Sequence, residues 1–168
     1  MSVVDEEGRT INGCDEPTHG EHYWRRSIFG MHPQADKLVE LGLAYWPREG
    51  FAVPGKWPEP EDFDITANEG WSGDEDDPND PQFSGDPGKI TAYYLAAANY
   101  FKQTYDERPG IAAYKLCHSN DGWWVTAAEC ASALKLWEQA GEPAVDGGNG
   151  DTIPFLRAGA AHFGFRVW

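Results

Sequence analysis

One acidic, proline-rich stretch limits what this chain can fold into. Between Trp57 and Gly88 the sequence holds eleven acidic residues and five prolines, and neither lysine nor arginine. Proline fixes φ and lacks a backbone donor, so long helices and central strands are excluded from most of it. Low hydrophobicity with high charge predicts a mobile loop over Gly70–Gly88. The four large apolar residues of the first half are expected to hold it against the body of the protein: Trp57, Phe63, Ile65 and Trp71.

The same stretch dominates the electrostatics. The formal net charge is −15, yet the residues outside the stretch hold 17 acids against 13 bases. A concentrated negative field repels nucleic acid and attracts basic partners or cations. The sequence therefore predicts a basic protein partner and no direct nucleic-acid binding, with simple solubilisation as the alternative.

Length and composition predict a single domain over residues 1–168, with an acidic insert at about 57–88. Aromatic residues make up 14% of the chain, enough for a substantial core. Acids at Asp5, Glu6 and Glu7 argue against a signal peptide, and Tyr93–Ala98 is too short an apolar run to span a membrane. Three unevenly spaced cysteines do not form a disulfide framework, so a cytoplasmic location without membrane association is expected.

The remaining chain shows local signals for helices and strands. Strands are predicted at Ser2–Val4, Tyr23–Phe29, Leu43–Trp46, Ile111–Leu116, Trp123–Val125 and Phe165–Trp168, with the fourth and fifth forming a hairpin. Helices are predicted from His32-Pro33 to Gly42, over Pro87–Tyr105, from a capping box at Thr126–Glu129 to Ala140, and over Ile153–His162. This order predicts an α+β fold, with a small antiparallel or mixed sheet covered by about four helices.

Three segments resemble parts of uncharacterised small proteins from actinobacteria and their phages. They are Tyr23–Met31, Ser119–Thr126 and Phe155–Trp168. The resemblance implies a source of that kind, and it implies no activity and no functional residue.

Candidate metal and nucleophile sites are sparse. Cys14, His19 and His22 supply three possible zinc ligands, with Cys117 or His118 as a fourth. Cys117-His118 with Asn120 and Asp121 offers a thiol and a base, but neighbours in a strand face opposite sides. Asp74, Asp76 and Asp80 resemble a calcium loop that Pro78 interrupts. For each of these, a structural role is the favoured interpretation, and no metal or cofactor is expected.

Two groups of residues remain as candidate contact sites. The partner-binding group is Asp74, Glu75, Asp76, Asp77, Asp80 and Trp71; the second group, for an anion or small ligand, is Arg25, Arg26, Trp24 and Asp121. For the two arginines, contact with the protein's own acidic segment is the favoured alternative. The first group supports a non-enzymatic protein that binds and inhibits a basic macromolecule, of the phage-inhibitor or toxin-neutralising type. One alternative is a small enzyme or ligand-binding domain with an aromatic pocket and Arg26, His118, Asp121 or His162 as polar groups. A nucleic-acid mimic is the other.

Overall fold

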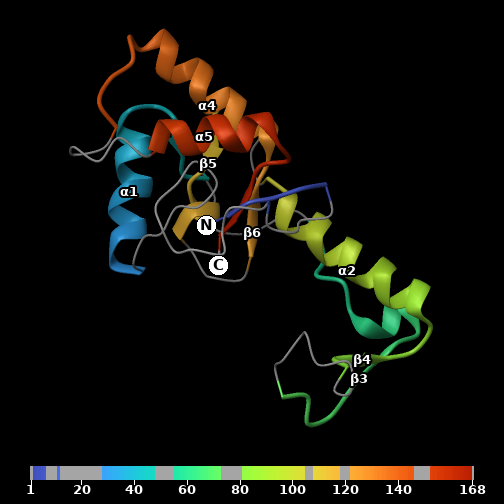
Figure 1. Cartoon of the computed structure of the whole chain (residues 1–168). Coiled ribbons are helices and arrows are strands. Elements are labelled where there is room, and N and C mark those ends of the chain that lie inside the picture. The colour runs from blue at the N-terminus through green and yellow to red at the C-terminus, as the bar shows by residue number, and fades with distance from the viewer. Residues whose placement is uncertain are drawn as a thin grey trace. The chain divides into compact units, whose positions relative to one another are not determined.

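The computed structural model describes residues 2–6, 11, 28–47, 55–72, 81–104, 108–117, 122–145 and 152–167 (Figure 1). The chain divides into two compact units. Unit 1 comprises Met1–Pro54 and Phe101–Trp168, and unit 2 comprises Gly55–Tyr100. The fold is α+β, as the sequence predicts.

The core of unit 1 lies beside a three-stranded antiparallel sheet. Strand β7 (Phe165–Val167) is central, between β1 (Ser2–Val3) and β6 (Trp123–Val125). Val125 pairs with Phe165, which in turn faces Val3 across the other ladder. All three strands predicted at these positions are therefore present.

A second, parallel pair brings together chain segments that are distant in sequence. Strand β2 (Ala44–Tyr45) pairs with β5 (Ile111–Ala112). The turn before β5 requires a glycine, because Gly110 has φ +102° and a Cβ there would lie 2.6 Å from the Leu43 carbonyl oxygen. The predicted hairpin between Ile111–Leu116 and Trp123–Val125 is wrong, since β6 pairs with β7 instead.

The rest of the predicted strand Ile111–Leu116 is also wrong. Residues Tyr114–Cys117 form a short helix, α3. Every residue from Ile111 to Cys117 is buried. A continuous buried run has no alternation of inward and outward side chains, so its pattern does not distinguish helix from strand.

Two antiparallel helices, α4 (Ala127–Gln139) and α5 (Thr152–Ala161), lie side by side against this core (Figure 1). Their close approach depends on Gly159, where a Cβ would lie 2.9 Å from the Cys130 Sγ. Both helices occur where the sequence predicts them. Gly141 (φ +82°) follows the first and Gly164 (φ +98°) follows the second, each in the left-handed region that favours glycine.

The start of α4 is a capping box. The Thr126 hydroxyl accepts a hydrogen bond from the Glu129 amide at 3.2 Å, and the Glu129 carboxylate accepts one from the Thr126 amide at 2.9 Å. Two first-turn donors are thereby satisfied.

Thr126→Ala is expected to lower the free energy of unfolding by about 0.5–2 kcal/mol, because the amide of Glu129 loses its acceptor. Urea denaturation of the purified variant measures this. A Thr126→Ser variant keeps the hydroxyl and should stay close to the parent protein. An unchanged stability in the alanine variant would contradict a structural role for the cap.

Helix α1 (Ile28–Glu40) begins earlier than predicted. Ile28 and Phe29 belong to this helix and not to a strand, while Tyr23–Ser27 lie outside the described residues. Pro33 falls inside the helix rather than at its start. Its missing N–H is offset by packing, because Met31, Ala35 and Leu38 are buried in the main core.

Unit 2 has a small core of its own. The 3₁₀ helix η1 (Pro60–Phe63) leads into an antiparallel pair formed by β3 (Thr66–Ala67) and β4 (Phe83–Ser84), and helix α2 begins at Pro87. Ile65, Phe83 and Tyr93 are buried together, with Phe63 and Ile90 packed against them. Phe63 and Ile65 thus serve a local core. Two of the prolines stand at the beginnings of elements, where a missing N–H costs least: Pro60 begins η1 and Pro87 begins α2.

Helix α2 spans Pro87–Lys102, three residues shorter at its end than predicted. The Asp86 carboxylate accepts hydrogen bonds from the backbone N–H groups of Gly88 at 2.9 Å and Lys89 at 3.2 Å. Part of the predicted mobile loop Gly70–Gly88 is therefore built into the unit, through Phe83 and this cap. Residues 73–80 lie outside the described residues. None of the described helices combines the length and apolar character needed to cross a membrane.

Candidate functional site

Unit 2 concentrates the negative charge of the protein. Gly55–Tyr100 contains eleven acids and two lysines, a formal net charge of −9. Both lysines are engaged by acids of the same unit: Lys89 contacts Asp64 at 2.8 Å and Lys56 contacts Asp62 at 3.4 Å. The hydrogen bond and charge of Lys89 lower the pKa of Asp64 below its ordinary value. No cation of this unit is left over to neutralise the other nine acids.

The described acids of this surface are exposed to solvent. They are Glu59, Glu61, Asp62, Asp64, Glu69 and Asp86. Four of them lie in or beside η1, which packs its Phe63 ring edge-on against Tyr93 at 5.7 Å between centroids. Burial raises the pKa of Tyr93, and the charges of Glu59 and Glu61 raise it further. Helix η1 and the neighbouring Asp64 therefore lie near the first half of α2.

Apolar side chains are exposed on the same unit. Tyr94 is 47% exposed and Leu95 is 53% exposed, both on α2. Tyr94 is oriented by a 2.9 Å hydrogen bond from its hydroxyl to the Gln82 side chain and by an edge-on contact with Phe83. Trp57 is 36% exposed and packs edge-on against Tyr100. Acidic groups and exposed apolar side chains therefore occur together on unit 2.

Most residues predicted from the sequence as contact sites fall outside the described parts of the chain. These are Asp74, Glu75, Asp76, Asp77 and Asp80 of the acidic group, and Trp24, Arg25, Arg26 and Asp121 of the second group. Trp71 is described and half-buried. Its indole Nε1 is buried and has no hydrogen-bond partner among the described residues.

Most of the candidate metal and nucleophile residues lie outside the described parts of the chain, and the structure does not support those that are described as reactive groups. Cys14, His19, His22 and His118 lie outside the described residues, and His162 is exposed. Cys117 is buried in α3, where burial raises the pKa of its thiol to about 11. A thiol of that pKa is a poor nucleophile at neutral pH, because little thiolate forms. Within the described ranges, no three His, Cys, Asp or Glu side chains group as metal ligands.

Unit 1 contains a buried ion pair that the sequence does not predict. Lys115 of α3 is 0% exposed, and its Nζ lies 2.9 Å from Glu129 Oε2. The ammonium also donates to the carbonyls of Lys102 and Trp124 and to the Thr104 hydroxyl, at 2.9–3.2 Å. Burial lowers the pKa of Lys115, and the charge of Glu129 opposes that shift. The capping-box motif identifies Glu129 as a structural residue, but no motif in the local sequence distinguishes Lys115.

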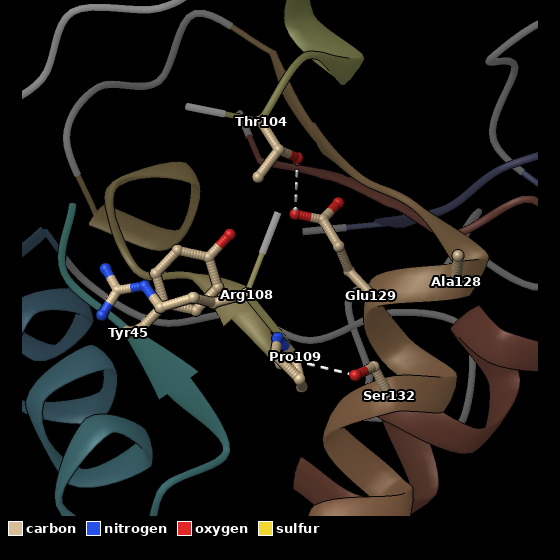
Figure 2. A pocket seen from close by; sticks show the side chains of 8 residues that line it. Tyr45, Thr104, Arg108, Pro109, Ala128, Glu129 and Ser132 are labelled. Carbon is tan, nitrogen blue, oxygen red and sulfur yellow. Dashed lines mark hydrogen bonds between the residues drawn. The ribbon is translucent and has the colours of Figure 1, made fainter. Parts of the chain in front are cut away.

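This ion pair borders a pocket of about 370 Å³ in unit 1. Figure 2 shows the side chains around it, with Thr104 and Glu129 joined by a hydrogen bond on one side and Tyr45 with Arg108 on the other. The guanidinium of Arg108 lies over the Tyr45 ring, 4.4 Å from its centroid, and donates to the Trp46 carbonyl at 2.6 Å. The lining of this pocket thus combines one aromatic ring with a carboxylate, a guanidinium and two aliphatic hydroxyls.

Comparison of the chain with models of protein families, with curated proteins and with solved structures found no match, so the candidate sites rest on their own geometry.

Proposed function

We propose that this chain is a non-enzymatic interaction protein that binds a basic macromolecular partner through unit 2. The observation that supports this most directly is the concentration of negative charge on unit 2. A unit with net charge −9 has both of its lysines held by its own acids, so its field is negative towards any approaching partner. Such a field accelerates the encounter with a basic surface.

The exposed apolar residues give the proposed interface a centre. Specific interfaces combine an apolar, often aromatic, core with a polar rim. Tyr94 and Leu95 would form that core, because they are the most exposed large apolar residues of the unit. The carboxylates of Glu59 and Glu61, close to the neighbouring Tyr93, would form part of the rim. Charge would steer the partner, and burial of the apolar side chains would retain it.

The partner class follows from this chemistry. A basic protein that acts on nucleic acid would present the cationic surface that unit 2 complements, and its occupation would inhibit that protein. This is the mode of a phage inhibitor or a toxin-neutralising protein, and the sequence resemblance suggests only that the host is actinobacterial. Imitation of nucleic acid is a narrower form of the same proposal.

The test compares two matched triple variants in affinity capture from an actinobacterial lysate, followed by calorimetry with the purified partner. The first variant is Glu59→Gln/Glu61→Gln/Glu69→Gln in unit 2. The second is Glu40→Gln/Glu138→Gln/Glu142→Gln, which removes three exposed acids from unit 1. If exposed charge pairs contribute about 0.2–1 kcal/mol each, the first variant should bind about 3- to 160-fold more weakly and the second should bind as the parent does.

The salt dependence supplies a second criterion. Screening shortens the range of surface charges to about 3 Å at 1 M salt, so the affinity of the parent should fall steeply as salt rises. The unit 2 variant should show a shallower dependence. Equal weakening by both triple variants, or a captured partner that is acidic, would overturn the proposal.

A further inference from the structure

The pocket of unit 1 holds a hydrogen-bond donor and an acceptor on one helix face. Ala128, Glu129 and Ser132 of α4 all line it, together with Gly110 and Pro109 (Figure 2). Residues three and four apart on a helix lie on the same side, with Cβ atoms about 5–6 Å apart. Glu129 and Ser132 are therefore spaced to contact two ends of one small molecule.

Ser132 is oriented so that its hydroxyl can donate. Its Oγ accepts a hydrogen bond from the Gly110 amide at 2.8 Å. A hydroxyl has one donor and two acceptor positions, so its proton remains for an acceptor in the pocket. Gly110 has a positive φ of +102° and lies close to the Leu43 carbonyl, so that a larger residue would not fit there. The position of this donor is consequently set by the backbone.

Glu129 has acceptor capacity on the pocket side. Three donors share its Oε2: Lys115 Nζ at 2.9 Å and the amide and hydroxyl of Thr126 at 2.9 and 3.0 Å. Its Oε1 accepts from the Thr104 hydroxyl at 3.3 Å. A carboxylate oxygen has two acceptor positions, so Oε1 can take a second donor. The Thr104 hydroxyl donates its proton to Glu129 and also accepts a hydrogen bond from Lys115 at 3.2 Å, so it has no proton left for a ligand.

The pocket lining contains one acid, Glu129, and one base, Arg108. Lys115 balances the charge of Glu129 from behind, and the Arg108 guanidinium adds a positive charge beside Tyr45. A ligand with both a donor and an acceptor, which a zwitterion carries a few atoms apart, would match Glu129 and Ser132 together. It would also be small, since the volume is about 370 Å³.

We propose that this pocket binds a small zwitterion of the α-amino acid class. The ammonium group donates to Glu129 Oε1. The carboxylate accepts from the Ser132 hydroxyl. The remainder of the ligand rests against Tyr45, Pro109 and Ala128. This site belongs to unit 1 and is independent of the acidic surface of unit 2.

The experiment titrates the ¹⁵N-labelled full chain with each standard L-amino acid and follows the amide resonances of Gly110, Glu129 and Ser132. At least one amino acid should shift these resonances with a dissociation constant in the range of about 0.01–1 mM, as expected for so few ligand atoms. Acetate and ethylammonium each present one end of the zwitterion and should bind at least about tenfold more weakly. Acetate binding as tightly as the best amino acid, or no shift with any of them, would overturn the proposal.

Two substitutions on one helix provide the matched control. Ala128→Leu places three extra carbons in the pocket and should weaken binding by about tenfold or more. Ala131→Leu makes the same change at an exposed position that does not line the pocket and should leave binding unchanged. Ser132→Ala removes the proposed donor and gives a second variant should Ala128→Leu disturb folding. Binding unaffected by both pocket substitutions would contradict the assignment.

Discussion

Lys115→Ala is expected to lower the free energy of unfolding by about 3–5 kcal/mol, because it breaks a buried ion pair from one side. The ammonium is fully buried, and its three N–H groups have four acceptors within 2.9–3.2 Å. Without it, the carbonyls of Lys102 and Trp124 lose a donor and the Glu129 carboxylate keeps a buried charge with no cation beside it. Urea denaturation followed by tryptophan fluorescence measures the loss.

A double variant separates the charge from the packing. Lys115→Met retains most of the side-chain volume but leaves the Glu129 charge unbalanced, so it should still destabilise strongly. Adding Glu129→Gln removes that charge, and the pair of substitutions should cost less than the sum of the two alone. Lys135→Ala, an exposed lysine on α4, should change stability by less than about 0.5 kcal/mol. Strict additivity in the double variant would show that the two groups do not interact.

Gly164→Ala is expected to destabilise the protein by about 2–5 kcal/mol, the sum of a backbone strain of about 1–2 and an overpacking cost of about 1–3 kcal/mol. Gly164 has φ +98°, and a Cβ there would lie 2.0 Å from the Val125 carbonyl oxygen. The turn between α5 and β7 must therefore move away from the end of β6. That movement would disturb the pairing of Val125 with Phe165 in the central sheet.

Gly141→Ala is the control for Gly164. It has a similar φ of +82°, but a Cβ there would meet nothing within 4 Å. Only the backbone strain should remain, about 1–2 kcal/mol. The difference in unfolding free energy between the two variants measures the steric part alone. Equal losses in both would show that the turn after α5 relaxes freely.

The candidate sites were predictable to different degrees. The excess of acids between Trp57 and Gly88 is visible in the sequence, and the structure adds that its first half shares a core with Phe83 and Tyr93. The pocket was not predictable. Tyr45, Thr104 and Ser132 come from three separate segments, and each is an unremarkable residue in its own surroundings. Only their spatial convergence makes them a candidate site.

Local backbone chemistry is what the sequence by itself determined about this protein. Thr126 and Glu129 mark the start of α4, and Gly42, Gly141 and Gly164 follow helices at positive φ, because caps and left-handed turns depend on neighbouring residues alone. Tertiary structure decided the rest. It paired β5 with β2 rather than with β6, and it made the buried run after Ala112 helical. It also placed Lys115 against Glu129. These outcomes depend on which distant segments share a core, and the free energy of burial there exceeds the weak local preferences of the chain.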